Sequence, residues 1–164
     1  SVSHNHDLSV SGGTEKTKVL FAMNYMDEEA GPLFPFGYGL GYGTFEWGNC
    51  SLSTERCNVA ALENKGLTIS FSVKNTSERG GYIVPQIYVT DVAASTVRRV
   101  KELKAFQKVW LDAGQERTVS LQLGKEAFCL WNQKMKYVAE PGVFQIELSD
   151  SAQTIWKGEF TLCI

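Results

Sequence analysis

Residues 67–75 read LTISFSVKN, and this stretch decides the fold class. Its apolar residues alternate with polar ones, at Leu67, Ile69, Phe71 and Val73. Because successive side chains of a β-strand point to opposite faces, the alternation predicts a strand with one buried and one solvated face. The turn-forming TSERGG follows at residues 76–81.

The same period of two recurs along the rest of the chain. Alternating segments follow in ERTVSLQLG at 116–124, VFQIELSD at 143–150 and TIWKGEFTLC at 154–163. The segment YIVPQIYVTD at 82–91 contains Pro85, which cannot donate a ladder hydrogen bond, so this strand is predicted at a sheet edge or with a bulge.

The spacing of these segments predicts an all-β fold. About seven short strands are separated by turns at roughly 8 to 12 residues, as in a sandwich. No stretch of residues 66–164 sustains a helical period, which excludes a parallel α/β domain, although KEAFCLW at 125–131 suits one short helical turn. We therefore expect an antiparallel β-sandwich of immunoglobulin or fibronectin type III kind, in which two sheets bury each other's apolar faces.

Composition narrows the classes of partner. The 164 residues include 16 Lys and Arg and 18 Asp and Glu, and no basic stripe is interleaved with aromatics. This composition argues against nucleic acid as a binding partner. No apolar run approaches the ~18 residues of a membrane span. The polar first residues show no signal peptide. A secreted or periplasmic location is favoured, and a cytoplasmic one stays open.

The chain has four cysteines, too few for a small disulfide scaffold. Cys50 and Cys57 bracket a six-residue loop and are a candidate disulfide. Cys129 lies in apolar AFCLW, which suits a buried free thiol, and Cys163 lies near the end of the last predicted strand. There is no C-x-x-C pair, so no metal site is expected.

The first part of the chain differs from the sandwich. Residues 1–17 are polar and rich in Gly and Ser, and predict a linker or frayed end. KVLFAMNYMD at 18–27 is an apolar run that predicts a strand, with no partner identified within the chain. PLFPFGYGLGYGTFE at 32–46 combines four glycines, two prolines and five aromatics, which indicates a segment that packs against other structure.

Residues 32–47 resemble the junction motif of glycoside hydrolase family 3, where a Pro-Leu-Phe-Pro-Phe-Gly run links the α/β-sandwich catalytic domain to a fibronectin-III-like domain. The match is ungapped from Pro32 to Leu40 and departs at Gly41 and Gly43, where the family usually has Ser or Thr. Three later segments resemble the same family in the same order: 73–91, 98–123 and 137–152.

The resemblance implies three parts. Residues 1–17 remain a linker, residues 18–48 are the last strand of the catalytic α/β sandwich and the junction, and residues 49–164 are the fibronectin-III-like domain. It also implies an N-terminal extension that docks on catalytic barrel and α/β-sandwich domains, in the same chain or a separate subunit. The residues expected to dock are Phe34, Phe36, Tyr38, Tyr42 and Phe45.

Family 3 enzymes are retaining β-glycosidases that need no cofactor, and retention requires two carboxylates about 5 Å apart. The family's nucleophile motif does not occur here, so the resemblance carries over no catalytic residue. The implied role is to stabilise the catalytic domains of an enzyme acting on terminal β-D-glucosyl or related residues. Arg98 and Arg99, in the 91–102 connection, are implied to lie towards the substrate entrance.

Other interpretations remain. Asp27, Glu28 and Glu29 form the densest acidic cluster, and His4 and His6 are the two histidines, but adjacent acids in a turn and a flexible end are poor catalytic or metal sites. The alternative function is a stand-alone carbohydrate-binding or adhesion module. It would use exposed aromatics, for which Trp110 and Trp131 are candidates, whereas Trp156 shares the inward face with Phe160.

Overall fold

A computed structural model describes residues 5–14, 17–26, 34, 37–95 and 100–163. The chain divides into two compact units, Ser1–Phe36 and Gly37–Ile164, and each is described by itself. None of the described helices is both long and apolar enough to cross a membrane.

The first unit is a β-hairpin. Strands β1 (Asn5–Thr14) and β2 (Thr17–Met26) pair antiparallel over their full length, from Asn5 opposite Met26 to Thr14 opposite Thr17. The expected linker over 1–17 therefore differs from the structure, and the apolar strand has a partner within the chain. The sequence pattern that would predict a strand is weak in β1, because Leu8 and Val10 are its apolar residues among many Ser and Gly.

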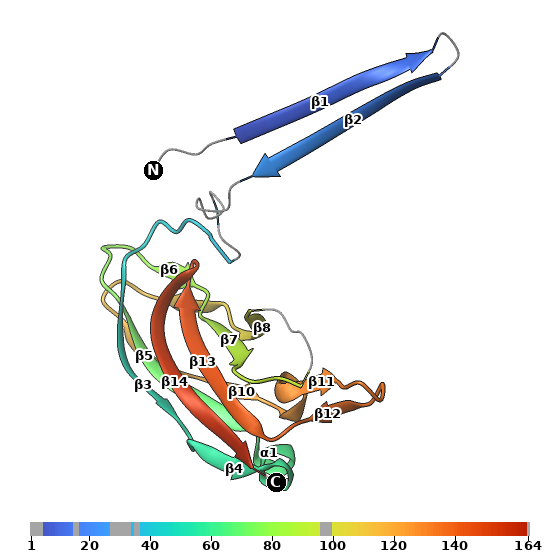
Figure 1. The fold of residues 1–164 in the computed structure, drawn as a ribbon. Helices are drawn as coiled ribbons and strands as arrows, with labels where there is room; N and C mark the ends of the chain where they lie inside the picture. The colour runs from blue at the N-terminus through green and yellow to red at the C-terminus, as the bar shows by residue number, and fades with distance from the viewer. Residues whose placement is uncertain (1–4, 15–16, 27–33, 35–36, 96–99, 164) are drawn as a thin grey trace. The chain divides into compact units, whose positions relative to one another are not determined.

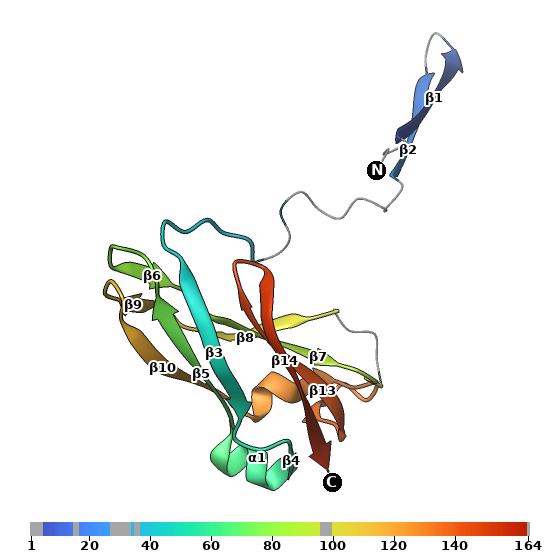
Figure 2. The same ribbon diagram turned by 90° about the vertical axis from the view of Figure 1, so that its left-hand side faces the viewer.

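The second unit is a sandwich of two sheets, which confirms the all-β prediction (Figures 1 and 2). One sheet has the order β10 (Glu116–Leu123), β5 (Leu67–Asn75), β3 (Phe45–Leu52). The other has the order β4 (Arg56–Asn58), β14 (Gln153–Cys163), β13 (Gly142–Asp150), β7 (Gln86–Asp91), β8 (Glu102–Phe106). All of these neighbours are antiparallel except β4 and β14, which are parallel.

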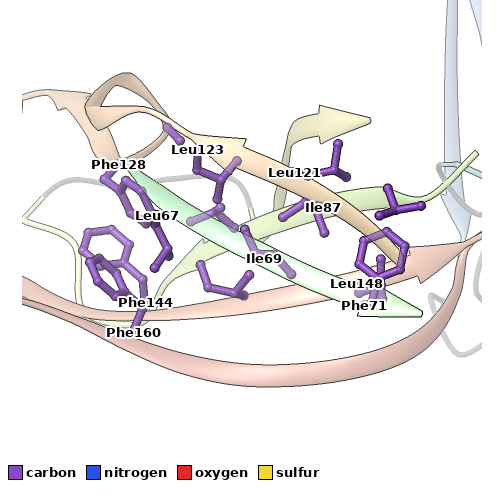
Figure 3. Packing of buried hydrophobic residues seen from close by; sticks show 14 of the residues in the cluster. Leu67, Ile69, Phe71, Ile87, Leu121, Leu123, Phe128, Phe144, Leu148 and Phe160 are labelled. Atoms are coloured by element: carbon purple, nitrogen blue, oxygen red, sulfur yellow. The ribbon is translucent and has the colours of Figure 1, made fainter. Parts of the chain in front are cut away.

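The core lies between the sheets, as Figure 3 shows. The predicted inward residues of 67–75 are all buried, and so are those of 116–124 and 143–150. Phe128, Phe144 and Phe160 meet ring to ring, with centroid distances of 5.1 Å from Phe128 to each of the other two. Trp156 is partly buried against this core, in agreement with its predicted inward face. Burial of each large apolar side chain contributes about 1.5 to 3 kcal/mol.

Pro85 divides a segment that the sequence predicts as one strand. Before it, β6 (Gly81–Ile83) pairs with β9 (Val109–Leu111) in a separate two-stranded sheet. After it, β7 lies between β13 and β8 and not at an edge, and its pairing with β8 shifts register between Ile87 and Tyr88, in agreement with the predicted alternative of a bulge. The missing N–H of proline is accommodated by ending one strand and starting another, because the chain changes sheets here.

Two short helices complete the sandwich. The predicted helical turn is the 3₁₀ helix η1 (Lys125–Phe128), which leads into the hairpin of β11 (Cys129–Trp131) and β12 (Tyr137–Ala139). Helix α1 (Val59–Lys65) was not predicted. Asn58 caps its start by accepting a hydrogen bond from Ala61 N at 2.8 Å, and Leu62 is fully buried.

Candidate domain-docking surface

Residues 37–44, here called the junction segment, lead into the sandwich. The segment begins at Gly37, which packs closely against Tyr88 and Gln86. Gly37 has a φ of +86°, and a Cβ there would lie 2.3 Å from Tyr88 Oη and 2.7 Å from Gln86 Oε1. Tyr88 is buried and its hydroxyl donates to Gln86 Oε1 at 2.7 Å. Both the backbone conformation and the close approach therefore require glycine.

Two further contacts fasten the junction segment. The Ser151 hydroxyl, in the turn between β13 and β14, accepts from Gly39 N at 2.8 Å and donates to Gly39 O. At the other end, Thr44 N donates to Ser77 Oγ at 2.7 Å, and Thr76 N donates to Thr44 O at 2.9 Å. The backbone is thus fixed to the sandwich before and after residues 40–43.

Between these anchors the side chains face solvent. Leu40 and Tyr42 are almost fully exposed, Tyr38 is exposed to a lesser degree, and a Cβ on Gly41 would meet no atom within 4 Å. A hollow of about 330 Å³ lies beneath the segment, bordered by Ile83 and Asp150 among others. The segment is therefore a rigidly attached loop that presents apolar side chains outward, as a docking element requires.

The β6–β9 pair extends this aromatic surface. Tyr82 and Trp110 lie opposite each other across the two strands, with ring centroids 4.8 Å apart at 68°. Lys108 Nζ lies 4.1 Å from the centre of the Tyr82 ring, and Trp110 Nε1 donates to Asp112 Oδ1 at 3.0 Å.

A second hollow, of about 680 Å³, is bordered by these two rings and by the apex of the junction segment. We call the exposed set the junction surface; its members are Tyr38, Leu40, Tyr42, Tyr82 and Trp110. The sequence did not point to Tyr82, because the register that pairs it with Trp110 joins residues 28 positions apart.

The expected docking residues fall into different environments. Tyr38 and Tyr42 belong to the junction surface, and Phe34, in the first unit, is exposed. Phe45 begins β3 and is partly buried against the core, so it anchors the segment, and its docking role stays a prediction. The expected boundary between residues 48 and 49 consequently falls inside β3. Phe36 lies outside the described residues.

Other candidates from the sequence lie outside the described residues. These are Arg98 and Arg99, the acidic cluster Asp27, Glu28 and Glu29, and His4. His6 lies in β1, where the structure describes the backbone. Within the described part of the chain, no group of three or more His, Cys, Asp or Glu side chains could hold a metal ion.

Two carboxylates of β13 have shifted pKa values. Burial works against ionisation of Glu147, but hydrogen bonds from Lys101 at 2.9 Å, Thr154 at 2.8 Å and Ser149 at 2.9 Å outweigh it and lower its pKa to about 2. Burial raises the pKa of Asp150, which is the sole carboxylate among the described residues that line the first hollow. Retaining glycoside hydrolysis needs a pair of facing carboxylates, and this hollow has one.

The candidate disulfide is not formed in the structure. All four cysteines are at described positions, and none of them is in a disulfide. Cys50 lies in β3 of one sheet and Cys57 in β4 of the other, and both pack against the core. Burial raises the pKa of Cys50 to about 11, so the thiol stays protonated at neutral pH. Cys129 is buried, as predicted.

The chain is similar in sequence to proteins of known family. The fibronectin type III-like domain family matches residues 83–152. A periplasmic β-glucosidase of Salmonella typhimurium is 42% identical over 143 residues, which are 87% of this chain and 18% of that protein. A β-xylosidase of Formosa agariphila is 40% identical over 129 residues, covering 79% of this chain and 17% of that protein.

A crystal structure of a Listeria innocua β-glucosidase in complex with glucose superimposes with a TM-score of 0.74 at 38% identity, covering 84% of this chain and 18% of that one. The chain thus spans less than a fifth of the length of each of these relatives. It contains a fibronectin type III-like domain and is homologous to one region of glycoside hydrolase family 3 β-glucosidases and β-xylosidases.

Proposed function

We propose that this chain is a non-catalytic region of a family 3 β-glycosidase, and that the junction surface docks on the catalytic domains. One observation carries the proposal. The junction segment is fastened to the sandwich at Gly37, Gly39 and Thr44, yet it leaves Leu40 and Tyr42 in solvent. A segment held so firmly with apolar side chains outward is suited to bury them against another domain.

The whole enzyme would hydrolyse terminal β-D-glucosyl or β-D-xylosyl residues without a cofactor. The names of the relatives support this substrate class. The barrel and α/β-sandwich domains would supply the two carboxylates, and the segment of residues 18–27 would complete the α/β sandwich. A periplasmic or secreted location is supported by the Salmonella protein, whose name places it in the periplasm.

A hydrolysis assay tests whether this chain is non-catalytic. The lone chain should release no product from an aryl β-glucoside or β-xyloside, with mass spectrometry confirming that no other chain is present. The same chain joined to barrel and α/β-sandwich domains should be active. Activity from the lone chain would overturn the non-catalytic assignment.

A substitution tests the docking role. Tyr42→Ser should leave the unfolding free energy of the lone chain within about 0.5 kcal/mol of the parent, because the side chain is exposed. In the longer enzyme it should lower the melting temperature. Met135→Ser is the matched control, since Met135 is also apolar and exposed but lies on the β11–β12 hairpin. Equal effects of the two substitutions in the longer enzyme would contradict docking through the junction surface.

A further inference from the structure

The β11–β12 hairpin carries a second exposed aromatic pair. Trp131 and Tyr137 lie opposite each other in the ladder, with ring centroids 5.4 Å apart at 41°. They are 62% and 47% exposed. Figure 1 shows the hairpin projecting from the sandwich at a different place from β6, and we call these two residues the hairpin pair.

The hairpin pair is held in place by its own turn. Asn132 N donates to Lys136 O at 3.0 Å, and Asn132 Oδ1 accepts from the backbone N of Lys134 and of Lys136. The Tyr137 hydroxyl donates to Glu126 O at 3.1 Å, which ties the ring to helix η1. Leu130, on the opposite face of the hairpin, is buried. The two rings are thus ordered before any ligand arrives, which lowers the entropic cost of binding.

The size of the hairpin pair argues for a small or linear ligand. Two aromatic side chains present at most about 300 to 500 Å². A stable protein interface buries about 800 Å² on each partner. The junction surface, with five apolar side chains around two hollows, is the larger of the two. A protein domain therefore fits the junction surface better than the hairpin pair.

Apart from the exposed Met135, the surroundings of the hairpin pair are polar. The exposed residues beside it include Gln133, Lys134 and Lys136, whose side chains supply hydrogen-bond donors and one amide acceptor. No carboxylate occurs within residues 131–137. A pyranose ring has an apolar C–H face and a rim of hydroxyl groups, so it can stack on an aromatic ring while its hydroxyls bond to such side chains.

We propose that Trp131 and Tyr137 form a stacking site for pyranose rings of a neutral polysaccharide. The site is separate from the junction surface and needs no catalytic domain. The choice of β-glucan as its ligand rests on the proposed function, whereas the stacking geometry does not. If the longer enzyme proves not to be a glycosidase, binding by the lone chain still decides this inference.

The test is affinity gel electrophoresis of the 164-residue chain in gels that contain laminarin or barley β-glucan. The parent chain should be retarded. Trp131→Ala should lower the affinity by roughly tenfold or more, as truncation of an aromatic anchor does. Trp110→Ala is the matched control, because it removes an exposed tryptophan from the junction surface. Its retardation should equal that of the parent.

An NMR titration and a gel that contains polygalacturonate distinguish ring stacking from loss of folding and from binding by the lysines. If Trp131→Ala does not fold, the indole N–H resonance of Trp131, assigned through Trp131→Phe, should shift on addition of laminarin while that of Trp110 stays. An absence of retardation in both glucans, or retardation unchanged in a folded Trp131→Ala, would overturn the proposal. So would binding confined to polygalacturonate and abolished by salt, since that would indicate the lysines instead of the rings.

Discussion

The junction surface and the hairpin pair use the same structural unit in different surroundings. Each contains a cross-strand aromatic pair, Tyr82 with Trp110 and Trp131 with Tyr137, at centroid distances of 4.8 and 5.4 Å. The first pair borders a hollow beneath a fastened loop, whereas the second stands on a short hairpin. The pair alone therefore does not define a partner; the area around it and the attachment of neighbouring backbone do.

The largest expected effect tests the attachment of the junction surface. Gly37→Ala adds a Cβ at 2.3 Å from Tyr88 Oη, on a residue with positive φ. Strain and overpacking together should lower the unfolding free energy by roughly 2 to 4 kcal/mol, measured by urea denaturation. Gly41→Ala, where no atom lies within 4 Å, should change it by less than about 0.5 kcal/mol. A Gly37→Ala chain as stable as the parent would show that the junction segment is loosely held.

The hydrogen bonds of Glu147 are expected to have an intermediate, pH-dependent effect on the unfolding free energy. This effect also concerns the attachment of the junction segment. Glu147 lies opposite Tyr88 in the ladder, and Tyr88 is the residue on which Gly37 rests. Its pKa in the folded chain is about 2, below its ordinary value of 4.5, so the ionised carboxylate stabilises the fold. That stabilisation is complete above about pH 4.5 and is lost as the pH falls towards 2.

Glu147→Gln should therefore lower the unfolding free energy at neutral pH by about 2 kcal/mol, the range for hydrogen bonds to a charged group. The difference between parent and variant should shrink as the pH is lowered to about 2. Urea denaturation across this pH range measures both quantities. A difference that does not depend on pH would assign the effect to shape rather than to charge.

The smallest effects compare one hydroxyl on each surface. Ser151→Ala removes the hydroxyl that both accepts from Gly39 N and donates to Gly39 O, and should cost about 1 kcal/mol of unfolding free energy. Tyr137→Phe removes one exposed bond to Glu126 O and should cost about 0.5 kcal/mol. Thermal denaturation with circular dichroism ranks the two. The reverse order would mean that the hairpin is the more tightly fastened surface.

The sandwich was predictable wherever apolar residues alternate over a full strand. Residues 67–75, 116–124 and 143–150 do so, and each is a strand with its predicted face buried. Helix α1 escaped prediction because seven residues are too few for a helical period, although its caps Asn58 and Gly66 are legible signals. Strand β1 was not predicted because its many Ser and Gly residues indicated a linker, and its alternation of apolar residues is limited to Leu8 and Val10.

The candidate site was predictable only in part. The aromatic and glycine content of residues 34–45 indicated a packing segment, but not that Phe45 faces the core while Tyr42 faces solvent. That difference follows from the anchor at Thr44, which bonds to residues 32 and 33 positions further along the chain. Likewise, only six residues separate Cys50 from Cys57 in sequence, whereas the fold places them in different sheets.

The borders of the two sheets bear on how this sandwich resists aggregation. The five-stranded sheet ends at β4, which has three residues, and at β8, whose pairing with β7 shifts register between Ile87 and Tyr88. The three-stranded sheet ends at β3, interrupted by a bulge between Gly48 and Ser51, and at β10, which begins with two charged residues. Short, bulged and charged borders are poor templates for a foreign strand. The domain can therefore expose aromatic side chains to solvent without offering its backbone for sheet extension.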